Sequence, residues 1–238
     1  MTDILCRQDP YLKTLKTQVT GLSDQGFETA ASIFHPQGGG QPGDQGLVQF
    51  DDQEVSILNS IKNETGDGVL HQVAEGKVLP CLGQEVTLEI NWEQRHRFMR
   101  VHTALHLLCR VVGAGVTGGA IGAEKGRLDF DVEESPDKEA LAKELNRLIQ
   151  EDHPVSYEAI TDAELDANPD LVRTMSVSPP RGSGTIRMVR IGTLDQTIDY
   201  QPCGGTHVRS TAEIGLVSIG KIEKKGKQNR RVNLLLAG

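Results

Sequence analysis

Hydrophobic residues follow two different periods along this chain, and the change falls near residue 90. Before it, apolar and polar positions alternate, as around Val86 and Leu88, which is the period of a strand with one buried face. Apolar runs at 47–50 and 55–58, separated by a polar turn, predict a hairpin. Because no helical period interrupts this pattern, we predict a small β-barrel over residues 1–90.

Beyond residue 90 the period becomes helical. Apolar residues then recur at a 3,4,3,4 spacing, which predicts a helix with one buried stripe. The stripe consists of Phe98, Val101, Leu105, Leu108 and Val112. Asn91 is suited to cap the start of this helix, and Gly113 is suited to end it.

The remaining sequence mixes strands and helices. Ser135 and Pro136 are predicted to open a second helix, and a capping box at Thr161 predicts a short third one. Loops are expected at 113–126 and 179–184, and strands at 127–132, 185–191, 214–222 and 230–236. The predicted fold class is therefore α+β: a β-barrel over residues 1–90, then an α+β domain over residues 91–238 with an antiparallel sheet and a metal-bearing helix.

Composition places the chain among ordinary globular proteins. It has 238 residues, of which 37% are hydrophobic. No apolar run approaches the length of about 20 residues that spans a membrane, and the N-terminal residues lack the features of a signal peptide. The four cysteines are scattered along the sequence, which favours a reducing, cytoplasmic location.

Charge is uneven along the chain. The net charge of −8 argues against indiscriminate binding of nucleic acid, but basic residues gather at 95–100 and at 221–231. These are either solvated faces or local contacts to phosphate groups, and we predict the latter. The predicted contacts are Arg97, Arg100, Lys221, Lys224, Lys225, Lys227 and Arg230. Arg95 and Arg97 oppose the dipole of the helix that they begin, so they require an external anion or a nearby acid.

Four residues have the spacing of metal ligands. His102 and His106 lie four positions apart in HTALH, so a helix presents both imidazoles on one face. Cys203 and His207 have the same separation in CGGTH, where the glycines allow a tight turn. Three imidazoles and one thiolate form a ligand set that Zn²⁺ prefers, and we predict a zinc site from these residues.

Each pair alone is weak evidence, because buried histidines that are satisfied by hydrogen bonds are common. Cys109 shares a helix face with His102, but it lies about 10 Å along the axis, too far for one ion to bind both together with His106. We therefore expect Cys109 in the core. A zinc protease would carry a glutamate after the first histidine of the helix. Thr103 occupies that position, which excludes the usual protease reading.

Together the motifs resemble a known family. HTALHLL, CGGTHVRSTAEIG and FHPQGGGQPGDQG are similar to the editing domain of alanyl-tRNA synthetase and, more closely, to the freestanding AlaX trans-editing proteins of medium length. The likeness extends from about residue 34 to residue 231. The glycine-rich motif in the barrel half is what distinguishes the medium-length form from the shorter one.

The resemblance implies a function and a site. Proteins of this family hydrolyse tRNA(Ala) that is wrongly charged with serine and sometimes with glycine, so the expected partner is mischarged tRNA(Ala) and the expected cofactor Zn²⁺. It implies that the four residues above hold zinc, that Thr103 acts in the reaction and recognises the serine hydroxyl, and that a loop from the barrel shapes the amino-acid pocket. That loop consists of Gly38, Gly39, Gly40 and Gln41. Residues 91–238 would then be the editing domain, and a homodimer is an open alternative to a monomer.

Other functions remain open from the residues themselves. The zinc could stabilise an RNA-binding module that has no hydrolytic activity, or it could serve a hydrolase that acts on a small amide. Because four protein ligands close a tetrahedron, a catalytic ion needs either a displaceable ligand, for which His207 is the candidate, or a fifth coordination position.

Overall fold

The computed structural model describes residues 2–175 and 184–237. The chain forms two compact units, Met1–His96 and Arg97–Gly238. The helix that was predicted to begin near residue 91 contains the division between them. Most of the loop predicted at 179–184 lies outside the described residues. Among the described residues, no helix combines the length and the apolar character that crossing a membrane requires.

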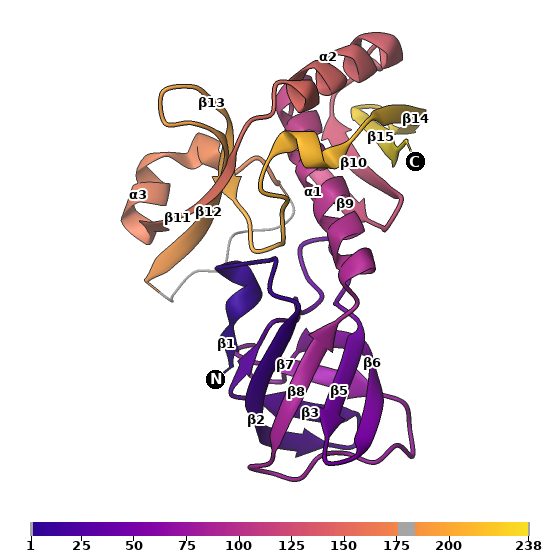
Figure 1. Cartoon of the computed structure of the whole chain (residues 1–238). Coiled ribbons are helices and arrows are strands. Elements are labelled where there is room, and N and C mark those ends of the chain that lie inside the picture. The colour runs from indigo at the N-terminus through magenta and orange to yellow at the C-terminus, as the bar shows by residue number, and fades with distance from the viewer. Residues whose placement is uncertain (1, 176–183, 238) are drawn as a thin grey trace. The chain divides into compact units, whose positions relative to one another are not determined.

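The first unit is built around a closed barrel of six strands, in the order β2, β3, β7, β6, β5 and β8 (Figure 1). Its strands are β2 (Thr14–Ser23), β3 (Gly26–Thr29), β5 (Gly46–Phe50), β6 (Gln53–Lys62), β7 (Val69–Val73) and β8 (Glu85–Ile90). Short strands β1 (Asp3–Ile4) and β4 (Ala31–Ser32) pair in parallel beside it, and a 3₁₀ turn covers Leu5–Arg7. The predicted barrel is confirmed, as is the hairpin between β5 and β6.

Alternation along the strands creates the barrel core. In β8, Val86, Leu88 and Ile90 are buried while Glu85 and Glu89 are exposed. The buried side chains of the strands join those of the following turns in one apolar cluster, which includes Phe27, Phe34, Val48 and Ile57. The period of two in the sequence is therefore the period of burial.

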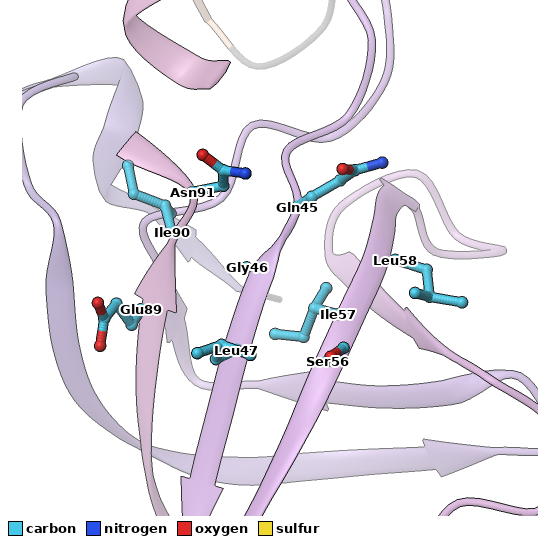
Figure 2. Close-up of a pocket in the computed structure, with 9 residues that line it drawn as sticks. All are labelled: Gln45, Gly46, Leu47, Ser56, Ile57, Leu58, Glu89, Ile90 and Asn91. Atoms are coloured by element: carbon cyan, nitrogen blue, oxygen red, sulfur yellow. The ribbon is translucent and has the colours of Figure 1, made fainter. Parts of the chain in front are cut away.

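A shallow pocket of about 380 Å³ lies on the surface of this unit, above Gly46 (Figure 2). Figure 2 shows Leu47 and Ile57 on the neighbouring strands β5 and β6, beside the glycine. A side chain at Gly46 is excluded, because its Cβ would lie 2.0 Å from the carbonyl oxygen of Glu89 and 2.8 Å from the ring of Phe34. Close packing of the strands therefore explains this glycine without a ligand.

Arg95 has a structural role within the first unit. Its guanidinium is buried and forms an ion pair with the buried carboxylate of Asp44. It also donates to the carbonyl oxygens of Pro10 at 2.9 Å and Ile33 at 2.7 Å. Of the two anions that the sequence left open for Arg95, the nearby acid is the one present.

His71 is a buried, neutral histidine in the barrel. Its ring packs against Phe27 and Phe34, and Nε2 donates to Oγ1 of Thr29 at 3.4 Å. Burial lowers the pKa of His71 from 6.5 to about 3, because the charged form would lose its hydration. The unfolded chain therefore binds a proton between these pH values that the folded barrel does not bind.

We expect acid to destabilise the barrel through His71. Because the unfolded state binds more protons, the free energy of unfolding falls by about 1.4 kcal/mol for each pH unit below 6.5, as far as about pH 3. Urea unfolding at pH 7, 6 and 5 measures it, followed by the fluorescence of Trp92, the single tryptophan. His71→Leu should flatten this dependence, and an unchanged slope in that variant would assign the effect to other groups.

The second unit contains most of α1 (Trp92–Val112) and two antiparallel sheets. One sheet has the strand order β14 (Val217–Gly226), β15 (Asn229–Leu236), β10 (Lys125–Asp131) and β9 (Val116–Ile121); the other has β11 (Val155–Thr161), β12 (Thr185–Gly192) and β13 (Thr197–Pro202). The remaining helices are α2 (Lys138–Gln150) and α3 (Asp162–Ala167), with 3₁₀ turns at Pro169–Leu171 and Thr211–Ile214. The α+β class is confirmed.

Several predicted boundaries hold and others are wrong. Asn91 caps α1 through a bond from the amide of Gln94, and the capping box begins α3 at Thr161. Helix α2 begins after Asp137, which accepts from the amide of Ala140 at 2.7 Å, and so not at residue 135. Strand β14 begins only at residue 217, because Gly215 has a φ of 71°.

The loop predicted at 113–126 is wrong over Val116–Ile121, which forms β9. Gly119 pairs with Leu128 of β10, and a Cβ there would lie 2.9 Å from the leucine side chain. The glycine thus leaves room for a large neighbour inside a strand, although the sequence pattern is typical of a loop.

Candidate metal centre

Helix α1 and the segment after β13 bring the four predicted ligands together. His102 and His106 project from adjacent turns of α1, and Cys203 and His207 follow the end of β13. One potential ligand atom of each residue lies within 4.8 Å of the corresponding atoms of the others. We call these four residues the metal cluster. The three imidazoles are buried and Cys203 is half-buried.

The spacing inside the metal cluster suits a tetrahedral ion. Sγ of Cys203 lies 3.4 Å from Nε2 of His102 and 3.3 Å from Nε2 of His207. Two ligands at about 2.0 and 2.3 Å from a tetrahedral ion would be about 3.5 Å apart. The three nitrogens and one sulfur could therefore hold a metal ion at their common centre.

Electrostatics within the metal cluster favour ligand forms of its residues. Burial alone would raise the pKa of the Cys203 thiol, but the charges of His102 and His207 lower it well below its usual value. Burial, together with the charge of His102, lowers the pKa of His207 well below 6.5. A thiolate and a neutral imidazole are the forms that bind metal.

His106 is held by an acid that sequence reasoning missed. Its Nδ1 lies 3.0 Å from Oδ2 of Asp199, which is 1% exposed. Burial lowers the pKa of His106, but the bond to Asp199 and the nearby Cys203 raise it to about 9. The same carboxylate oxygen accepts from Nε2 of Gln201 at 2.8 Å.

Thr103 lies next to His102 in sequence but contacts His207. Its hydroxyl donates to the carbonyl oxygen of Met99 at 2.9 Å and lies 3.1 Å from Nδ1 of His207. The amide of Val208 also donates to it, at 3.3 Å. The side chain is completely buried.

Two residues on the three-stranded sheet hold the segment that carries Cys203 and His207. Arg187 of β12 donates to the carbonyl oxygens of Cys203 at 2.6 Å and Gly205 at 3.0 Å, and its guanidinium lies 4.1 Å from the ring centroid of Tyr157. The hydroxyl of Tyr157 donates to the carbonyl oxygen of His207 at 3.3 Å. These contacts fix the backbone that positions the two ligands.

Known proteins share these features. Residues 186–233 match a domain family described as the Threonyl and Alanyl tRNA synthetase second additional domain. The chain is 32% identical to the alanyl-tRNA editing protein AlaX-M of Methanosarcina acetivorans, with 99% of each chain covered, and 32% identical to AlaX-M of Saccharolobus solfataricus, with 98% of each covered. It is also 35% identical to an alanine–tRNA ligase of Pyrobaculum neutrophilum, where the match covers 91% of this chain and 25% of the ligase. The chain belongs to the AlaX-M family of alanyl-tRNA editing proteins.

Membership confirms the resemblance that the motifs indicated. AlaX editing proteins are aminoacyl-tRNA deacylases, which makes this chain an enzyme of that class with tRNA(Ala) as its partner. The metal cluster supplies a site where such a hydrolase could hold an ion.

The glycine-rich motif of this AlaX-M protein forms a tight turn in the first unit. Gly38 and Gln41 exchange two backbone hydrogen bonds of 3.0 Å, and Gly39 and Gly40 have φ values of 59° and 81°. Positive φ at both central positions defines a type I′ turn, which favours glycine. The tip is exposed while the side chain of Gln41 is buried.

The basic residues that were predicted to contact phosphate differ in their surroundings. Arg230 is buried and donates to the carbonyl oxygens of Gly226 and Asn229, so it fastens the turn between β14 and β15. This environment argues against a phosphate contact for Arg230. Lys225 pairs with Glu223 at 3.0 Å. Lys221, Lys224 and Lys227 are exposed.

Arg97 and Arg100 line a different surface, a pocket of about 360 Å³ that also includes Lys125. Arg97 lies 3.4 Å from Glu124, and Nε of Arg100 donates to the carbonyl oxygen of Ile214 at 2.9 Å. At 100° per residue, both arginines project from α1 on the side away from His102. A phosphate bound here would therefore lie away from the metal cluster.

Proposed function

We propose that this AlaX-M protein hydrolyses seryl-tRNA(Ala) in trans, with glycyl-tRNA(Ala) as a second substrate, and so prevents mistranslation of alanine codons. The observation that carries the proposal is the convergence of His102, His106, Cys203 and His207 in a chain that matches AlaX-M proteins along nearly its whole length.

The chemistry of amino-acid selection explains the need for such an activity. A pocket that accepts alanine rejects serine by only about 10²-fold, because it must exclude an added hydroxyl without a steric barrier. A separate hydrolytic site that binds this hydroxyl discriminates further. In that site we propose that Gly38, Gly39, Gly40 and Gln41 shape the pocket for the amino acid.

We also propose that the resident ion is zinc. The chain offers three imidazole nitrogens and one thiolate, the donor set that zinc prefers and that magnesium or calcium does not. When bound, zinc can polarise the ester carbonyl or orient the substrate. The protein's part is to hold the ester beside the cluster and to place a water for attack on its carbonyl carbon. The acid Asp199 already bonds to His106 and Gln201, which leaves it poorly placed to act as the base for that water.

A deacylation assay with three charged forms of tRNA(Ala) tests the proposal. The purified protein should release serine, release glycine, and leave alanyl-tRNA(Ala) intact. Seryl-tRNA(Ala) that stays intact, under conditions where an alanyl-tRNA synthetase editing domain cleaves it, would refute the proposed substrate. Cleavage of small amides in the same preparation would favour a hydrolase of another class.

Exposed lysines of the β14–β15 hairpin are proposed to bind the tRNA backbone. Changing Lys224 and Lys227 to glutamate should weaken tRNA binding and reduce the slope of log affinity against log salt by about 1 for each lost contact. The matched control changes Lys138 and Lys143, which are exposed on α2, so that the net charge is the same. Equal losses in both variants would indicate bulk charge rather than a contact.

The oligomeric state enters as a smaller proposal. A homodimer is compatible with the expected function, and sedimentation equilibrium of the purified protein tests it directly.

A further inference from the structure

We propose that Thr103 and Asp199 are positioning residues, which fix the orientation and the proton of His207 and His106 and thereby set the metal affinity of the cluster. This inference rests on the proposed zinc site. It gives Thr103 a different role from the contact to the serine hydroxyl that the family resemblance implied.

The contact between His106 and Asp199 fixes one imidazole. An ionised carboxylate only accepts hydrogen bonds, so Nδ1 of His106 carries the proton that spans the 3.0 Å to Oδ2. The lone pair then remains on Nε2, which is left for the metal. Gln201 donates to the same oxygen at 2.8 Å, and Nε of Arg173 lies 3.5 Å from Oδ1, so the carboxylate is itself held in place.

Thr103 fixes the second imidazole in a corresponding way. Its hydroxyl donates to the carbonyl oxygen of Met99, one turn earlier on α1, and this bond turns its lone pairs toward His207 and Val208. The hydroxyl can therefore only accept from Nδ1 of His207, which again leaves Nε2 for the metal, 3.3 Å from Sγ of Cys203.

The same bonds argue against a contact between Thr103 and substrate. A hydroxyl has one donor and two acceptor positions, and Met99, His207 and Val208 occupy all three. The side chain has no exposed surface. A serine hydroxyl would have to displace one of these partners to reach it.

The two supports differ in strength. Groups that orient a metal-bound histidine typically contribute 10- to 100-fold to metal affinity. Asp199 carries a charge and a second oxygen near Arg173, whereas Thr103 offers a neutral acceptor. We therefore expect Asp199→Asn to weaken zinc binding by about 100-fold and Thr103→Val by about 10-fold.

Zinc affinity, measured by competition with a chromophoric chelator, tests these values without using activity. Thr103→Ser keeps the hydroxyl and should restore the affinity that Thr103→Val loses. Thr211→Val is the matched control, because the Thr211 hydroxyl also donates to a helix carbonyl, that of Leu148, and accepts from an amide, that of His153, away from the cluster. This control should bind zinc as the unchanged protein does.

Cobalt substitution adds a spectroscopic readout. The visible absorption of Co²⁺ reports the ligand set, so it should remain tetrahedral in Thr103→Val and Asp199→Asn at saturating metal while titrating at higher Co²⁺ concentrations. Unchanged zinc affinity in both variants would overturn the inference, and so would an equal loss in Thr211→Val. A variant that does not fold is replaced by Thr103→Ala or Asp199→Ser in the same titration.

Substrate discrimination separates the two roles of Thr103. At saturating zinc, Thr103→Val should keep the ratio of kcat/KM for seryl-tRNA(Ala) over alanyl-tRNA(Ala). Loss of this ratio with unchanged zinc affinity would establish a substrate contact and refute the positioning role. If the unchanged protein deacylates neither substrate while the zinc affinities fall as expected, the proposed function fails and the positioning role stands.

Discussion

Replacing Cys203 with alanine should abolish stoichiometric zinc binding and reduce deacylation of seryl-tRNA(Ala) to the uncatalysed rate. Sites with four protein ligands bind zinc with an apparent free energy of about 10–16 kcal/mol. One ligand of four thus corresponds to about 3 kcal/mol, or at least about 100-fold in affinity. The effect should be largest for Cys203, because it is the one thiolate of the cluster and the neighbouring imidazoles lower its pKa. Metal analysis after gel filtration and a deacylation assay measure both results.

Cys109 supplies the matched control. It lies on α1 in the same unit, it is buried, and burial raises the pKa of its thiol to about 12, so the thiolate that binds metal is disfavoured. Cys109→Ala should keep zinc and activity and lose about 1 kcal/mol of stability. Zinc retained in Cys203→Ala would refute the ligand set. Deacylation that survives the loss of zinc would remove the ion from the mechanism.

The sequence predicted the ligands because their chemistry is local. A separation of four positions places His102 and His106 on one helix face, and this holds in any fold that contains the helix. What brings Cys203 to the same point is the packing of α1 near β13, which no local pattern contains. Only the resemblance of the motifs to a known family linked the two pairs before the structure did.

The residues that support the ligands were missed for a related reason. Asp199, Gln201 and Cys203 occupy alternate positions at the end of β13, so they share one face of the strand. This period of two was available in the sequence, but it indicates a metal partner only after Cys203 is known to be a ligand. The role of Thr103 was hidden differently, because its partners Met99 and His207 belong to segments far apart in the chain.

The barrel was predicted from alternation, and its failures lie where side chains do not report burial. Gly118 and Gly119 of β9 have no side chains with which to form an alternating pattern, so a strand was predicted as a loop. Arg95 is the opposite case, since a charged residue is expected at the surface. Only the position of Asp44 shows that this arginine belongs to the core.

Replacing Arg95 with methionine should destabilise the first unit by about 3–5 kcal/mol. The substitution keeps an apolar stem but leaves the buried carboxylate of Asp44 without a counter-charge. It also removes the donors to the carbonyl oxygens of Pro10 and Ile33, which then lack these partners. Urea unfolding followed by the fluorescence of Trp92 measures the change in this unit, because that residue is the single tryptophan.

A double-mutant cycle separates the ion pair from packing. Adding Asp44→Leu to Arg95→Met should recover part of the lost stability, because an unpaired buried charge costs more than the absence of both charges. Lys16→Met removes a positive charge from an exposed position on β2 and should change stability by no more than about 0.5 kcal/mol. A loss below 1 kcal/mol in Arg95→Met would mean that Asp44 reaches water or takes up a proton, and that the basic residue at the start of α1 remains available for another anion.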